Sequence, residues 1–170
     1  MFVADTQEKT IIGYDLSNSG SNLYASKFGT LVRNVAAQWL AADDFQNVYY
    51  TDSESQQIFK LEAGERVGEY GEPRRLYALP DDPELTLPTG IAADNLHIYF
   101  TSGGEGLVHG AVHKAYSNPP TADRQDAIMP LAKNAPAAKT VCAAQSNIFF
   151  TDEDDRMFVV KKQGSAVAMV

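Results

Sequence analysis

Apolar and polar residues alternate in short blocks along the whole chain, and the apolar blocks have the length of strands. Runs rich in β-branched and aromatic residues are separated by polar turns such as 43–47 and 102–106. Runs of this composition, bounded by Gly, Asn, Asp and Ser, are typical of strands. No stretch between them keeps the period of a helix. The pattern therefore predicts an all-β protein.

One pentapeptide recurs at an almost constant interval. Clear copies occupy 48–52, 98–102 and 148–152, and residues 1–5 form a weaker fourth copy. Their last positions are 47, 50 and 50 residues apart. A second apolar element precedes three of the copies, and a third follows all four. Three matched elements in one order at one period indicate an internal repeat.

Repeats of this length with several short strands are typical of β-propeller blades, in which sheets pack face to face around an axis. The pentapeptide strand is apolar on both faces, as expected for a sheet packed between two others. We therefore expect a propeller or partial propeller of about four blades in one domain. Its repeats should occupy approximately 1–34, 35–84, 85–134 and 135–170.

The first repeat starts directly at its pentapeptide strand, so we expect its blade to have three strands and to lack the innermost one. Blades two and three should hold four antiparallel strands each. Blade four should hold up to four, the fourth being formed if residues 165–170 make its outer edge. This arrangement gives at most fifteen strands.

The repeated residues carry a family resemblance. Residues 48–52, followed by Ile58, and the segment 88–94 that leads into 98–102 resemble the YWTD-type repeats of low-density-lipoprotein-receptor propellers. They are also similar to NHL and SMP-30/gluconolactonase-like propellers. Trp is missing from the aromatic pair in all four copies, and Ser102 replaces the terminal Asp of the third. The resemblance implies the fold, whereas its members include receptors, scaffolds and hydrolases.

Composition narrows the class of partner. The chain has 14 Lys and Arg against 22 Asp and Glu, a formal charge of −8, which disfavours a nucleic-acid partner. No run approaches the roughly 18 apolar residues that a membrane span requires. Cys142 is the single cysteine, so no internal disulfide can form. We expect no cofactor.

Few residues suggest metal chemistry. SMP-30-like enzymes gather metal ligands around the axis, and the resemblance makes Asp43 and Asp94, at the ends of innermost strands, weak candidates. Ala144 breaks that pattern in the third copy. His109 and His113 have a zinc-like spacing, but their strand-like surroundings favour ordinary surface or core histidines.

Two loops and a glycine-rich segment have simpler explanations. The acidic residues 152–155 could hold calcium, but a solvated hairpin turn is favoured. Residues 103–106 are better explained by a tight hairpin than by a phosphate-binding loop. The irregular segment 115–126 is favoured as a solvated connection over a binding loop.

An incomplete first blade predicts a protein partner. It would expose an apolar face containing Phe2, Ile12 and Tyr14, which a missing amino-terminal portion, a second copy or a different subunit would cover. Trp39 could anchor a partner, although packing is favoured. The competing arrangement is a four-bladed ring closed by residues 167–170 beside 1–5.

The sequence therefore favours a non-enzymatic scaffold or binding module that acts through protein–protein contacts, for example as an accessory subunit of a larger assembly. The alternative is a fragment of a metal-dependent hydrolase of the SMP-30/gluconolactonase type. No GxSxG motif or other nucleophilic constellation supports catalysis.

Overall fold

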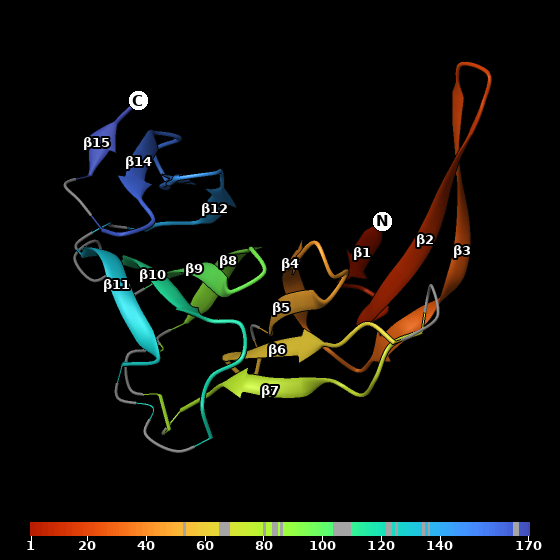
Figure 1. Cartoon of the computed structure of the whole chain (residues 1–170), viewed down its shortest axis with the longest axis horizontal. Coiled ribbons are helices and arrows are strands. Elements are labelled where there is room, and N and C mark those ends of the chain that lie inside the picture. The colour runs from red at the N-terminus through yellow and green to blue at the C-terminus, as the bar shows by residue number, and fades with distance from the viewer. Residues whose placement is uncertain are drawn as a thin grey trace.

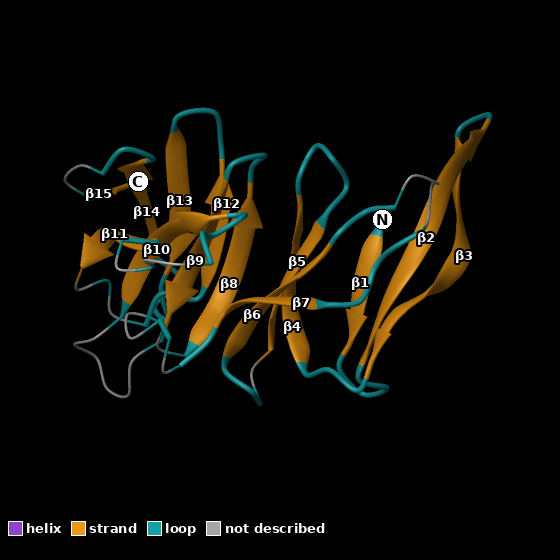
Figure 2. Ribbon diagram, turned by 60° about the horizontal axis from the view of Figure 1, so that its bottom comes forward, coloured by secondary structure: helices purple, strands orange, loops and turns teal. Residues whose placement is uncertain are grey.

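The computed structural model is built from strands and turns, as the alternating pattern predicts. It describes residues 1–170 except 53, 65–68, 80, 83–84, 86, 104–109, 122–123, 125, 134, 136 and 165–166. The described residues contain no helix (Figure 2), and therefore no helix that could cross a membrane.

The described strands form four antiparallel sheets that follow one another in chain order (Figure 1). The first sheet contains β1 (Phe2–Asp5), β2 (Thr10–Ser19) and β3 (Asn22–Arg33). The second contains β4 (Ala37–Ala42), β5 (Val48–Asp52), β6 (Gln57–Leu61) and β7 (Arg74–Tyr77). The third contains β8 (Pro88–Ala93), β9 (His97–Ser102), β10 (Ala111–Tyr116) and β11 (Ile128–Lys133). The fourth contains β12 (Thr140–Ala143), β13 (Asn147–Thr151), β14 (Met157–Lys161) and β15 (Ala168–Met169).

The pentapeptide forms the same strand in each sheet. In the last three sheets it is the second strand, β5, β9 or β13, with a partner on each side. In the first sheet it is β1, which has β2 as its one partner among the described strands. β1 packs against β4 of the second sheet, as β5 packs against β8 of the third. The expected propeller-type fold, with a first blade that lacks its innermost strand, is confirmed.

Each pair of neighbouring sheets encloses one hydrophobic cluster. Ile11 and Tyr50 belong to the cluster between the first and second sheets. Tyr49 and Phe100 belong to the cluster between the second and third, and Tyr99 and Phe150 to the next. Adjacent aromatic residues of one strand thus point into opposite clusters, which explains why the pentapeptide is apolar on both faces.

The threonine of the pentapeptide links one sheet to the next. Thr51 Oγ1 donates a hydrogen bond of 2.9 Å to the carbonyl oxygen of Thr89 on β8. Thr101 Oγ1 makes the equivalent bond of 3.0 Å to Lys139, immediately before β12. These partly buried bonds join the pentapeptide strand to the start of the next innermost strand.

The four sheets form an open arc. Figure 1 shows the first and fourth sheets at its two ends. β1 pairs with β2, and β15 pairs with β14, so the ring closure by 167–170 beside 1–5 is not formed. The β2–β3 hairpin extends beyond its sheet, and its residues 15–27 are exposed. Among the described strands, none packs against one face of the first sheet or against one face of the fourth.

Candidate functional site

Asp43 stabilises the turn between β4 and β5. Its carboxylate accepts hydrogen bonds from the backbone N–H and the side-chain amide of Asn47, at 2.9 and 2.8 Å. The hydroxyl of Tyr49 donates a third bond of 2.9 Å. Burial and this bond to an anion raise the pKa of Tyr49. Asp43 therefore acts as a turn residue whose oxygens are already engaged.

Asp94 has the same role between β8 and β9. It accepts from the backbone N–H groups of Leu96 and His97, at 3.1 and 2.9 Å, and from the Tyr99 hydroxyl at 2.9 Å. Lys162, which follows β14, adds an ion pair of 2.8 Å from the fourth sheet. Burial by itself would raise the pKa of Asp94, but the hydrogen bonds from Lys162, His97 and Tyr99 hold it far below its usual value.

The fourth sheet lacks both members of this pair. Ala144 stands where the other two turns have aspartate, and Phe149 stands where β5 and β9 have tyrosine. A buried tyrosine hydroxyl without an acceptor would be costly, so the two changes compensate each other. Asp43 and Asp94 thus each form a Tyr–Asp pair with the strand that follows their turn. This structural role explains the two aspartates without a metal ion, and we propose no metal site at these turns.

A polar pocket of about 370 Å³ lies where three of these turns meet at one end of the sheets. Its lining residues are Asp44, Asp94, Asn95, Leu96, His97, Tyr99, Lys114, Gln145, Lys162 and Gln163. The turns are linked to one another, because Asp44 N–H donates to Asn95 Oδ1 at 3.0 Å and Asn95 Nδ2 donates to Asp44 Oδ2 at 3.1 Å. The pocket is therefore framed by segments of the second, third and fourth sheets.

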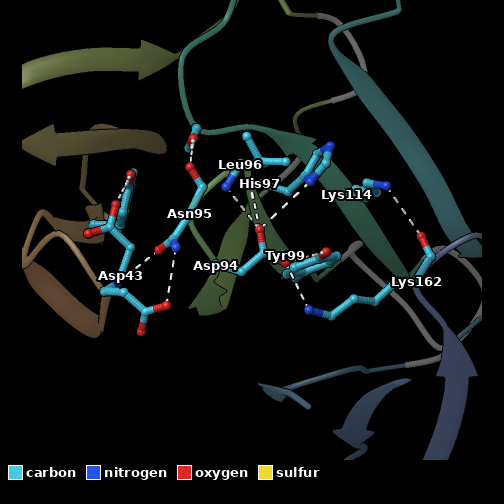
Figure 3. Close-up of polar contacts among 11 residues, drawn as sticks. Asp43, Asp94, Asn95, Leu96, His97, Tyr99, Lys114 and Lys162 are labelled. Carbon is cyan, nitrogen blue, oxygen red and sulfur yellow. Dashed lines mark hydrogen bonds and ion pairs between the residues drawn. The ribbon is translucent and has the colours of Figure 1, made fainter. Parts of the chain in front are cut away.

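The charges around this pocket are unequally matched, as Figure 3 shows. Lys162 is paired with Asp94 and lies 5.0 Å above the centre of the Tyr99 ring. The ammonium of Lys114 reaches only the carbonyl oxygen of Lys162, at 3.5 Å, and has no ion pair with any residue that the structure describes. Burial, followed by the charge of Lys114, lowers the pKa of His97. Among the described residues, the pocket therefore contains one cation, Lys114, that has no ion pair, and one carboxylate, that of Asp44, whose partner is a neutral amide.

Of the two histidines with a zinc-like spacing, His113 alone lies in the described part of the chain. His113 is buried on β10, where its Nε2 lies 3.0 Å from Ser102 Oγ and its ring stacks on Phe100 at 4.9 Å. Burial lowers the pKa of His113 to about 4. His109 and residues 104–106 of the glycine-rich segment lie outside the described residues.

The acidic turn after β13 is held by a cation of its own chain. The Asp152 carboxylate is buried and accepts from Arg156 Nε at 2.8 Å and from the backbone N–H of Asp154 at 3.0 Å. Arg156 also pairs with Asp154 at 2.9 Å. This geometry is that of a closed hairpin turn, which the sequence favoured over a calcium site.

The uncovered face of the fourth sheet carries a continuous apolar row. Cys142, Phe149, Val159 and Ala168 are register partners across its four strands. Their chain neighbours Ile148 and Val160 point into the cluster shared with the third sheet, so the row points the other way. In the second and third sheets, Tyr49 and Tyr99 at the position of Phe149 are fully buried by the following sheet. We call this row the fourth-sheet face.

The uncovered face of the first sheet contains two of the three residues expected there. Val3 pairs with Ile12, and Tyr14 follows Ile12 by two positions on β2, so these three share one face, which we call the first-sheet face. Val3 is 37% exposed, whereas Tyr50 at the equivalent position of β5 is 1% exposed. Phe2 lies on the opposite face, because it packs into the cluster with the second sheet and meets Tyr70 edge-on at 5.8 Å. The expected surface is therefore smaller by one aromatic ring.

Trp39 lies on β4 beside an irregularity in the pairing with β5. Its side chain is 36% exposed, and it belongs to none of the hydrophobic clusters of the described residues. Trp39 thus remains a candidate contact residue.

The segment 115–126 is described except for residues 122, 123 and 125. Within it, Arg124 makes a bidentate contact with the buried Asp82, at 3.0 and 2.9 Å. This contact ties Arg124 to the interior.

The architecture is that of known propellers. Streptogramin B lyase superposes with a TM-score of 0.62 at 14% identity over 99% of this chain and 49% of that protein. The luciferin-regenerating enzyme gives a TM-score of 0.61 at 15% identity over 93% and 53%. A chain of the nidogen/laminin complex gives 0.54 at 14% identity over 94% and 70%. No family model and no curated protein matches the sequence.

These likenesses concern the fold alone, because the identities are low. The chain spans about half the length of the first two propellers. The three proteins include enzymes and a protein that is found in a complex, so the fold does not choose between those functions.

Proposed function

We propose that this chain is a propeller-type binding module that acts through protein–protein contacts at the two ends of its arc. The observation that carries the proposal is the pair of uncovered sheet faces. The fourth-sheet face presents Phe149 and Val159 where equivalent rows are buried by a following sheet. Covering apolar surface contributes about 25 cal/mol for each Å² removed from water, so a protein surface is the fitting occupant.

The composition of the two faces supports this function. The fourth-sheet row has no charged member. Phe149 stands where the two preceding sheets have Tyr49 and Tyr99, so the row also lacks their hydroxyl group. The first-sheet face contributes Val3, Ile12 and Tyr14. The partner is a protein or a second copy of the chain that packs against these faces as one blade packs against the next.

The alternative function is a metal-dependent hydrolase, in the manner of the enzymes among the similar folds. Its ligands would have to include Asp43 and Asp94, and both carboxylates are engaged by their own turns, Asp94 also by Lys162. This use of the carboxylates favours the binding function.

Light scattering of the purified chain tests the proposal. We expect a species heavier than the 18.5 kDa protomer, and we expect Val159→Lys to shift it towards that mass by placing a charge in the contact. Phe45→Lys is the matched control, because Phe45 lies in an exposed turn and is 66% exposed. A stable, monodisperse 18.5 kDa species contradicts the proposal in the form in which a second copy covers the faces. That form is also contradicted if neither Val159→Lys nor Ile12→Lys changes the assembly.

A second measurement addresses the hydrolase. Lactone and ester hydrolysis is assayed with added Ca²⁺ or Zn²⁺, and no metal-dependent turnover is expected. Metal-dependent turnover that is lost in Asp94→Ala would replace the binding function with the enzymatic one.

A further inference from the structure

The second and third sheets meet through a charged cluster around Lys60. The ammonium of Lys60 is held by Asn118 at 3.0 Å and by Glu62 at 3.5 Å, and the side chain of Lys60 is only 5% exposed. Arg74 contacts the same two partners, at 2.7 and 3.3 Å. Lys60 and Arg74 therefore each have an acceptor.

The repeat identifies the equivalent residues at the junction of the third and fourth sheets. Lys60 pairs with Tyr49 and Lys114 pairs with Tyr99, so the two lysines occupy the same position. Two residues further on, Tyr116 stands in place of Glu62. The lysine is thus retained at the second junction, and its carboxylate partner is lost.

The polar pocket described above borders Lys114. Lys114 lines it together with Gln145, Gln163 and the turn of His97. The carboxylate of Asp94 pairs with Lys162 at 2.8 Å, and that of Asp44 accepts a hydrogen bond from the neutral amide of Asn95. Among the described residues neither carboxylate pairs with Lys114, so its ammonium is open to an anionic ligand (Figure 3).

We propose that this pocket binds a small organic carboxylate, whose anionic group pairs with Lys114 as Glu62 pairs with Lys60. One unmatched ammonium suits a single negative charge, whereas a phosphate dianion would require additional cations. The amides of Gln145 and Gln163 can bind a second polar group of the ligand. A volume of about 370 Å³ lies within the range of small-molecule sites. This site is independent of the two sheet faces proposed to bind protein.

Nuclear magnetic resonance of the ¹⁵N-labelled chain tests the site. The probes are sodium acetate and acetamide, which have similar shapes and differ in charge, added at constant ionic strength. We expect acetate, and not acetamide, to cause saturable shifts at the backbone of Leu96 and His97 and at the side-chain amides of Gln145 and Gln163. Saturation in the millimolar range is expected for so small a probe.

Three variants separate the site from general charge effects. Lys114→Gln should weaken acetate binding about tenfold or more, because it removes a charge-assisted hydrogen bond. Tyr116→Glu restores the carboxylate found at the other junction and should abolish acetate binding by occupying Lys114. Lys27→Gln removes the same charge from the exposed hairpin and should leave the affinity unchanged.

Equal shifts with acetate and acetamide, or shifts that do not saturate, overturn the proposal. It is also overturned if acetate binds equally well to Lys114→Gln, or to Tyr116→Glu should the first variant not fold.

Discussion

The hydroxyl of Tyr49 donates a 2.9 Å hydrogen bond to Asp43, and Tyr99 makes the same bond to Asp94 one repeat later. Each bond joins the body of a pentapeptide strand to the turn that precedes it. In the fourth sheet Phe149 and Ala144 replace the two partners together. The pair therefore functions as a unit that a repeat either has or lacks.

The first prediction concerns this unit. Asp43→Ala should lower the free energy of unfolding by about 1–3 kcal/mol, because the buried Tyr49 hydroxyl loses its hydrogen-bond acceptor. The double variant Asp43→Ala/Tyr49→Phe, which copies the fourth sheet, should lose less than the sum of the two single variants. Urea denaturation of the four proteins gives the coupling energy. Additive losses would show that the two side chains do not act together.

Gly90 allows the third and fourth sheets to approach closely. A Cβ atom built there would lie 2.5 Å from the carbonyl oxygen of Lys139 and 2.9 Å from Thr140 Cα, both of which are backbone atoms. Gly90→Ala should therefore destabilise the protein by about 1–3 kcal/mol. Gly29→Ala is the control, since nothing lies within 4 Å of its added Cβ. Equal thermal stabilities of the two variants would contradict this account of the junction.

Arg124 neutralises a carboxylate in the interior. Asp82 has a side chain only 2% exposed and is paired with Arg124, which also donates to the carbonyl oxygen of Leu76 at 2.6 Å. Arg124→Ala should cost about 3 kcal/mol or more, because it leaves a buried charge unpaired. Arg75→Ala should cost well under about 1 kcal/mol, because Arg75 and Asp81 are both more than half exposed. Denaturant titration of both variants measures the difference.

The repeat made most of the fold predictable. The period, the apolar faces of the pentapeptide and the missing first element together specify sheets of three, four, four and four strands, which the structure forms. These features are local, so a single sequence displays them. The expectation that Phe2 lies on the uncovered face is wrong, because Phe2 packs into the cluster shared with the second sheet. In a strand of only four residues, the alternation of side chains does not show which face packs against the next sheet.

The candidate site was less accessible to sequence reasoning. The sequence makes Asp43 and Asp94 weak candidate metal ligands because they stand at the ends of innermost strands. In the structure their carboxylates accept hydrogen bonds from residues that follow in the same turns. The joint replacement by Ala144 and Phe149 was the available signal for a Tyr–Asp pair. The pocket could not be predicted in this way, because it depends on Lys114 and Lys162 meeting across a sheet junction.

The last prediction is a loss of stability in mild acid caused by His113. Its side chain is 3% exposed, and burial holds its pKa at about 4, below the value near 6.5 of an unfolded histidine. Between these values the unfolded chain binds a proton that the folded chain does not, so the free energy of unfolding falls as the pH decreases from about 6.5 to about 4.

The contribution of this one residue is of order 3 kcal/mol across that window. It is measured by comparing wild type with His113→Phe, which places at this position the residue found in the equivalent stacked pairs Tyr50–Phe59 and Phe150–Phe158. The replacement alters the contact with Ser102, so the decisive quantity is the change of unfolding free energy with pH rather than its value at one pH. His97 and the carboxylates titrate in both proteins and cancel in the comparison. If the two proteins lose stability in parallel from pH 6.5 to 4, His113 is protonated in the folded state as readily as in the unfolded state, and the burial argument fails.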